Sequence, residues 1–200
     1  DGKVTLDWDR SAEYSKDQYM GNITTNVDLY DFEGYKVYRA TDFEFNDAYN
    51  ITDGDGNPTF LEPYVQNGVR AQWDLVNGKS GWHPVDLNGI KYYLGNETGL
   101  VHSYVDNDVV NGQRYYYAVV SYDYGGDLTN NIIPSDSPMK LRVNPLTGAV
   151  SLGPNVVEVV PSPPSAGFVD ASFAGDQVDH VAGSSSCLLY TSPSPRDTVR

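Results

Sequence analysis

The chain of 200 residues has a single cysteine, Cys187, and few basic residues: 13 Lys and Arg stand against 27 Asp and Glu, giving a formal net charge of −14. Nucleic acids and anionic membrane surfaces are bound through clustered Lys and Arg, so this balance argues against both. No apolar run approaches the roughly 18 residues of a spanning helix, and the N-terminal residues lack the pattern of a signal peptide. We therefore expect neither nucleic-acid binding nor membrane insertion.

The cysteine lies in a tail that does not resemble native protein. Residues 187–197 match, in order, the in-frame translation of a transposase sequencing adapter, which explains them better than a Ser/Pro-rich disordered tail. We predict that residues 187–200 are adapter read-through and exclude them from the fold. Together with the absence of a starting Met, this indicates a fragment from metagenomic sequencing, cut near Ser186. No cysteine then remains for a disulfide or a thiol-based site.

Catalytic motifs are scarce as well. The three histidines, His83, His102 and His180, do not pair at the spacing of a metal-binding helix, and no nucleophile elbow, phosphate-binding loop or kinase signature occurs. Two carboxylates could serve a glycosidase, but pairs such as Asp42 and Glu44 are expected in a chain this acidic. The sequence therefore predicts a protein that is not an enzyme.

Signals for β-structure are abundant. The chain contains 16 Tyr, 19 Gly and 12 Pro, and no segment carries the period of an amphipathic helix. Alternation of apolar and polar residues predicts strands at residues 4–8, 34–39, 113–124, 139–143 and 156–160. The dipeptide Asn111-Gly112 before the third run is a strong turn signal. We predict an all-β, antiparallel fold.

The spacing of these strands suggests an organisation into domains. A long stretch between the second and third runs, at about 44–105, contains the turn dipeptides Asp53-Gly54, Asn67-Gly68, Asn77-Gly78, Asn88-Gly89 and Gly95-Asn96. We interpret it as an insertion, with hairpins of its own, into a domain that covers 1–145. Residues 146–155 are expected to be a linker, and residues 156–186 the truncated start of a second β-domain.

Three of the predicted strands carry a family resemblance. Val4–Trp8, Gly34–Arg39 and the run Asn111–Val119 resemble, in order and spacing, a fibronectin type III domain. The resemblance implies an immunoglobulin-like β-sandwich, with a core built from Trp8, Tyr35, Val37, Tyr115, Tyr117 and Val119. It further implies that the Tyr115 hydroxyl bonds back to the backbone, as in a tyrosine corner. The expected first strand is missing, and the long insertion departs from the family pattern.

Such modules stand in series in large bacterial secreted or surface proteins, so the resemblance implies an extracellular or cell-surface location. We expect a non-catalytic structural or binding module whose partners are neighbouring domains of the same chain, glycans or surface proteins. The alternative is a carbohydrate-binding accessory domain of a polysaccharide-degrading enzyme. For that role, Trp73, Trp82, Tyr92 and Tyr93 would form a platform on which sugar rings stack; otherwise these aromatic side chains form the core of the insertion.

The only cofactor that the sequence suggests is calcium. Asp53, Asp55 and Asn57 alternate with glycines, and such a loop can direct several oxygens at one hard cation. Asp47 or Glu62 could complete the shell. The full twelve-residue calcium loop is not met, because Pro58 stands where glycine is expected. An ordinary Gly-rich hairpin turn therefore remains the alternative.

Overall fold

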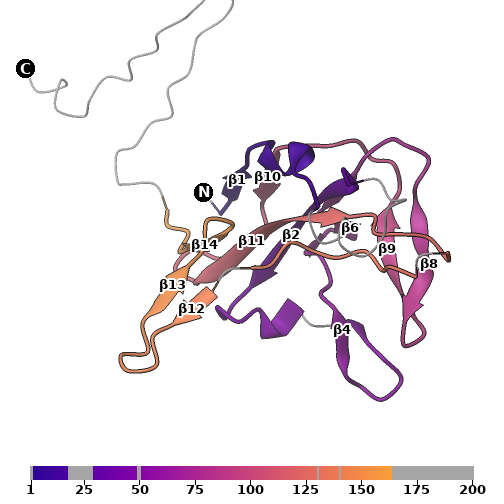
Figure 1. Cartoon of the computed structure of the whole chain (residues 1–200). Helices are drawn as coiled ribbons and strands as arrows, with labels where there is room; N and C mark the ends of the chain where they lie inside the picture. Colours follow the sequence, from indigo (N-terminus) through magenta and orange to yellow (C-terminus); the bar gives the residue numbers. More distant parts are fainter. Residues whose placement is uncertain (1, 18–28, 49–50, 130, 140, 164–200) are drawn as a thin grey trace, which may run out of the picture. The chain divides into compact units, whose positions relative to one another are not determined.

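Four strands form the central sheet, in the order β14-β11-β2-β7. They are β2 (Phe32–Ala40), β7 (Gln72–Asp74), β11 (Tyr115–Asp123) and β14 (Val156–Val159). Figure 1 labels three of them, β14, β11 and β2. A second sheet pairs β1 (Val4–Asp7) with β10 (Ser103–Asp106). The computed structural model describes residues 2–17, 29–48, 51–129, 131–139 and 141–163, and all structural statements below concern these residues.

Four hairpins and two short 3₁₀ turns complete this part of the chain. The hairpins are β3 (Ile51–Thr52) with β4 (Pro58–Phe60), β5 (Val65–Gln66) with β6 (Val69–Arg70), β8 (Gly81–Leu87) with β9 (Ile90–Gly95), and β12 (Leu141–Val143) with β13 (Val150–Leu152). The 3₁₀ turns are η1 (Ser11–Tyr14) and η2 (Asn46–Ala48). Every strand pairing is antiparallel, which confirms the predicted all-β, antiparallel class and is consistent with a β-sandwich. Among the described residues, no helix is long and apolar enough to cross a membrane.

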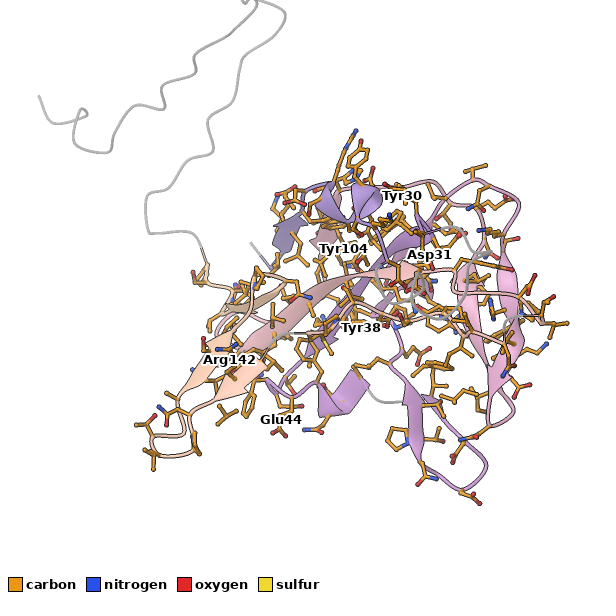
Figure 2. All side chains as sticks on the ribbon, viewed as in Figure 1. Tyr30, Asp31, Tyr38, Glu44, Tyr104 and Arg142 are labelled. Atoms are coloured by element: carbon orange, nitrogen blue, oxygen red, sulfur yellow. The ribbon has the colours of Figure 1, made fainter. Side chains whose placement is uncertain are left out.

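The two central strands, β2 and β11, are covered on both faces (Figure 2). They pair with Val37 opposite Val119 and Tyr38 opposite Ala118. Because side chains alternate along a strand, each strand supplies both faces of the sheet. Val37 packs in a cluster with residues of β1, whereas Tyr38 packs with residues that surround η2. The dense run of aromatic and β-branched residues in β11 follows from this double burial.

The predicted core is largely confirmed. Tyr35, Val37, Tyr115 and Tyr117 are buried, with exposed fractions of 6% or less. Trp8 and Val119 are only partly buried, so for these two the prediction was too strong. Trp8 follows the last residue of β1 instead of lying within the strand. Trp8 and Val119 both line a groove that is described below.

The domain boundaries differ from those expected. Residues 156–159, assigned by sequence to a second domain, form β14 and pair with β11 in the central sheet. The expected linker, 146–155, contains β13, which pairs with β12. Residues 164–186 of the expected second domain and the adapter-like residues 187–200 lie outside the described part of the chain.

The expected insertion does form hairpins, but it also contributes to the two sheets. β7, from its middle, pairs with β2 at the edge of the central sheet. β10 lies at its end and pairs with β1. The segment 44–105 is therefore part of the same folded unit and not an appendage, because its strands complete both sheets.

The Tyr115 hydroxyl makes the backbone contact that the resemblance implies. It accepts a hydrogen bond from the backbone N–H of Val110, at 3.0 Å. Tyr115 is buried at the start of β11, and this bond ties the strand to the turn that precedes it.

Candidate functional site

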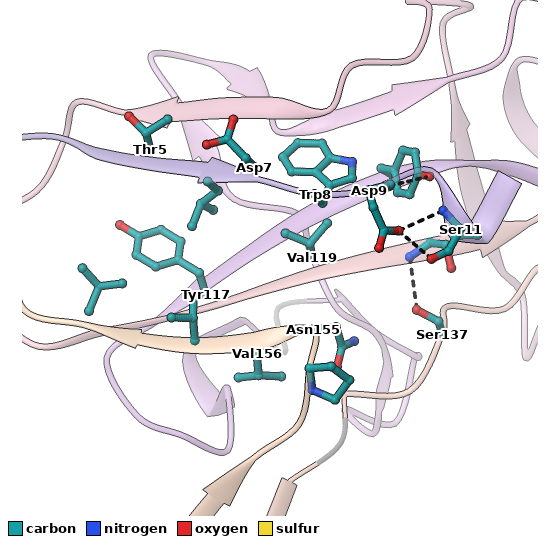
Figure 3. Close-up of a pocket in the computed structure, with 17 residues that line it drawn as sticks. Thr5, Asp7, Trp8, Asp9, Ser11, Tyr117, Val119, Ser137, Asn155 and Val156 are labelled. Atoms are coloured by element: carbon teal, nitrogen blue, oxygen red, sulfur yellow. Dashed lines mark hydrogen bonds between the residues drawn. The ribbon is translucent and has the colours of Figure 1, made fainter. Parts of the chain in front are cut away.

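A lateral groove of about 640 Å³ lies between β1, with the turn that follows it, and the pair β11 and β14 (Figure 3). Its floor includes three valines, Val119, Val157 and Val159. Val157 lies opposite Tyr117 in the strand register, and residues opposite one another share a face of the sheet. Val157 is nevertheless 43% exposed, whereas Tyr117 is completely buried. The residues of β1 therefore cover Tyr117, but they leave Val157, on the edge strand β14, exposed.

One edge of β1 faces this groove. Trp8 donates its backbone N–H to the carbonyl of His102 at 3.0 Å, which makes these two residues a hydrogen-bonded pair. Backbone groups in an antiparallel pair point alternately toward the partner and away from it. The N–H and C=O groups of Thr5 and Asp7 therefore point away from β10. Both residues line the groove, and no described strand pairs with that edge.

The groove also contains two buried polar atoms without a partner among the described residues, Trp8 Nε1 and Asn155 Oδ1. An unsatisfied buried donor or acceptor costs about 1–3 kcal/mol. The Trp8 ring itself is held in place, with its centroid 5.8 Å from the rings of both Tyr35 and Trp73. Trp8 and Asn155 both line the groove, but these two atoms are themselves buried.

The charge of the groove is negative. The described residues that line it include two carboxylates, Asp7 and Asp9, and no Lys or Arg. Asp9 accepts hydrogen bonds from the side chain and the backbone N–H of Ser11, and these bonds lower the pKa of the Asp9 carboxyl below its ordinary value. Asp9 therefore remains charged at and well below neutral pH.

The four aromatic residues predicted as a sugar platform do not share one face. Trp73 lies in β7 and packs between Trp8 and Tyr104, and Tyr92 is buried. Trp82 is 60% exposed and meets Tyr93 edge to face, with centroids 5.0 Å apart and planes at 64°. The structure thus brings together only Trp82 and Tyr93, and these two rings are not coplanar.

The predicted calcium loop is closed by its own hydrogen bonds. Asp53 Oδ1 accepts the backbone N–H groups of Asp55 and Asn57, at 3.0 and 2.8 Å, and the Asn57 side chain donates to the same carboxylate. These bonds lower the pKa of the Asp53 carboxyl. These hydrogen bonds are the ones expected of the alternative, an ordinary hairpin turn, which here joins β3 to β4. Calcium at Asp53, Asp55 and Asn57 stays a prediction.

A second group of carboxylates was not predicted from the sequence. Asp17, Asp31 and Asp123 each place an oxygen within 4.8 Å of the other two. Burial raises the pKa of Asp123 to about 6, against two hydrogen bonds from Ser135 that lower it; the charges of Asp31 and Asp17 raise it further. Hard cations such as Ca²⁺ favour oxygens of this kind. The three residues are far apart in the chain, so no local spacing could reveal the group.

Calcium binding at either place is tested by thermal melting with millimolar Ca²⁺ or with a chelator. A cation that binds only the folded chain raises the melting temperature. We expect Asp53→Asn to abolish the rise if the loop binds, and Asp123→Asn if the second group binds. In the latter case the rise should also fade below about pH 6, as Asp123 becomes protonated. Identical melting with Ca²⁺ and with chelator would exclude both sites.

The histidines and the paired carboxylates have structural contacts. His83 is buried, and its Nε2 lies 2.8 Å from the carbonyl oxygen of Gly126. His102 Nε2 lies 2.5 Å from Glu13 Oε1. Asp42 accepts the backbone N–H of Glu44 within a turn. His180 lies outside the described residues.

Comparison with protein-family models, with curated proteins and with solved structures finds no match to this chain. Its function must therefore be inferred from its own residues and geometry.

Proposed function

We propose that this chain is a fibronectin type III-like, non-catalytic structural or binding module of a secreted, multidomain surface protein. Support comes first from the strand order. In immunoglobulin-like sandwiches, strands C, F and G share one sheet, and strands B and E belong to the other. The order β14-β11-β2 is compatible with strands G, F and C, and the pair β1-β10 with strands B and E.

The observation that carries the proposal is the bond between Tyr115 and the backbone of Val110. A tyrosine at the start of strand F that bonds to backbone a few residues upstream is a hallmark of these sandwiches. The Tyr115 bond thus supports the proposal with a specific side-chain contact, in addition to the strand order. The expected location, outside the cell, follows from the resemblance alone.

The lateral groove supports the binding half of the proposal. It combines an apolar floor, an open strand edge and two carboxylates on one side of the fold. Such a surface suits contact with another segment of polypeptide, which fits a module that presents or joins its neighbours.

The alternative, a carbohydrate-binding accessory domain, is favoured by one observation: Trp82 is exposed beside Tyr93. Affinity electrophoresis in gels that contain soluble polysaccharides separates the two functions. We expect the same mobility in gels with and without polysaccharide for the wild type, for Trp82→Ala and for Tyr14→Ala. Tyr14 is the matched control, because it is an aromatic residue with 73% exposure outside the predicted platform.

Retardation of the wild type and of Tyr14→Ala, abolished by Trp82→Ala, would contradict the structural module and establish the carbohydrate-binding alternative. Release of dye from chromogenic glycosides or esters by the purified chain would contradict the non-catalytic assignment.

A further inference from the structure

We propose that the lateral groove binds an extended peptide from a separate chain, with alternating apolar and basic side chains, which adds as a strand to the free edge of β1. The inference rests on the proposed function as a binding module and names the class of its partner. Recognition of this kind uses backbone hydrogen bonds for affinity and alternate side chains for specificity.

The backbone groups for this pairing are present. The N–H and C=O groups of Thr5 and Asp7 point away from β10, and both residues line the groove. An unpaired edge of this kind is a template for a further strand. A peptide laid along β1 would thus extend the two-stranded sheet to three strands.

The floor of the groove selects the apolar positions of the peptide. Val157 and Val159 alternate along β14, and Val119 lies beside them on β11. A strand added to β1 would place every second side chain over these valines and cover them. Val157, which is 43% exposed, would gain most from being covered.

The other side chains of the peptide face a negative rim. Asp7 and Asp9 are the charged residues of the lining, so Lys or Arg at alternate positions would complement them. The same charge disfavours a second copy of this chain as the occupant, since each copy carries a net charge of −14.

The test uses the full chain and a dye-labelled peptide, Lys-Val-Lys-Val-Lys-Val-Lys, titrated by fluorescence anisotropy. We expect saturable binding that Val157→Lys weakens by about tenfold or more, because the substitution removes apolar contact and adds a like charge. Val143→Lys is the matched control, since Val143 is 48% exposed on β12, outside the groove lining. This control should bind within about twofold of the wild type.

Two further readouts separate strand addition from charge attraction. The peptide Lys-Ser-Lys-Ser-Lys-Ser-Lys, which keeps the charge and loses the apolar side chains, should bind at least about tenfold more weakly. In ¹H–¹⁵N spectra, the indole N–H signal of Trp8, assigned with Trp73→Phe and Trp82→Phe, should shift on addition of the valine peptide.

The inference is overturned if both peptides bind alike, if Val157→Lys and Val143→Lys have equal effects, or if no binding occurs. A dimer in sedimentation experiments that Val157→Lys disrupts would assign the groove to a second copy instead. The polysaccharide and hydrolysis assays test the proposed function separately, so a failure of this inference is distinguishable from a failure of that function.

Discussion

Replacing Asp106 by alanine is expected to lower the free energy of unfolding by about 3–5 kcal/mol, because it removes the buried partner of an ion pair and leaves Arg39 and the Tyr117 hydroxyl without this acceptor. The Asp106 side chain is completely buried, and its Oδ2 accepts hydrogen bonds from Arg39 Nη1 at 2.9 Å and from the Tyr117 hydroxyl at 2.7 Å. Its other oxygen accepts the backbone N–H of Asp108. The carboxylate thus joins β10 to both central strands.

Asp108→Ala is the control for that variant. Asp108 also pairs with Arg39, at 3.7 Å, but its side chain is 76% exposed, and exposed pairs contribute at most about 1 kcal/mol. Urea denaturation monitored by tryptophan fluorescence measures both variants. Equal losses for Asp106→Ala and Asp108→Ala would show that burial does not set the strength of this network.

Asp136→Ala is expected to have an effect of similar size, about 3–5 kcal/mol, through the buried amine of Lys36. Lys36 Nζ lies 3.4 Å from Asp136 Oδ1, 2.5 Å from the Tyr92 hydroxyl and 3.8 Å from the centre of the Tyr92 ring. Burial lowers the pKa of Lys36, and the charge of Asp136 opposes this. Asp136 also accepts hydrogen bonds from the Tyr92 and Tyr38 hydroxyls.

A second substitution identifies the cause of that loss. Lys36→Met in the Asp136→Ala background should recover a large part of the stability, because an apolar side chain of similar volume needs no counter-charge. Chemical denaturation of the two single variants and the double variant gives the coupling free energy. Additive effects would indicate that Asp136 acts through the tyrosine hydroxyls and not through Lys36.

Local sequence patterns predicted the two central strands, but neither β7 nor the pairing of β14 at the edges of the central sheet. β2 and β11 have nine residues each and are rich in aromatic and β-branched side chains, so residue type and alternation suffice to predict them. β7 has only three residues, Gln72–Asp74, and no period can be read from so few. Its burial depends on distant contacts, such as those of Gln72 Nε2 with the carbonyl oxygens of Tyr93 and Leu94. The valines of β14 predicted a strand, but local alternation does not specify the sheet in which it pairs.

The candidate site was predicted less well than the fold. Trp8 was expected in the core from its place in the family pattern, whereas it lines a groove. Alternation along Val4–Asp7 indicates which side chains point inward, but not whether each edge of the strand has a partner. The groove exists because no described strand pairs with the free edge of β1. That edge can be recognised only once the sheets are assembled.

The two carboxylates beside the free edge of β1 have a consequence for behaviour in acid. Exposed strand edges promote stacking of identical chains into fibrils, and charged side chains at the edge oppose it. Asp7 and Asp9 are the charged side chains beside the free edge of β1. The hydrogen bonds from Ser11 lower the pKa of the Asp9 carboxyl, so Asp9 stays ionised at lower pH than an ordinary aspartate. We therefore expect Ser11 to extend the range of pH over which the chain resists assembly with itself.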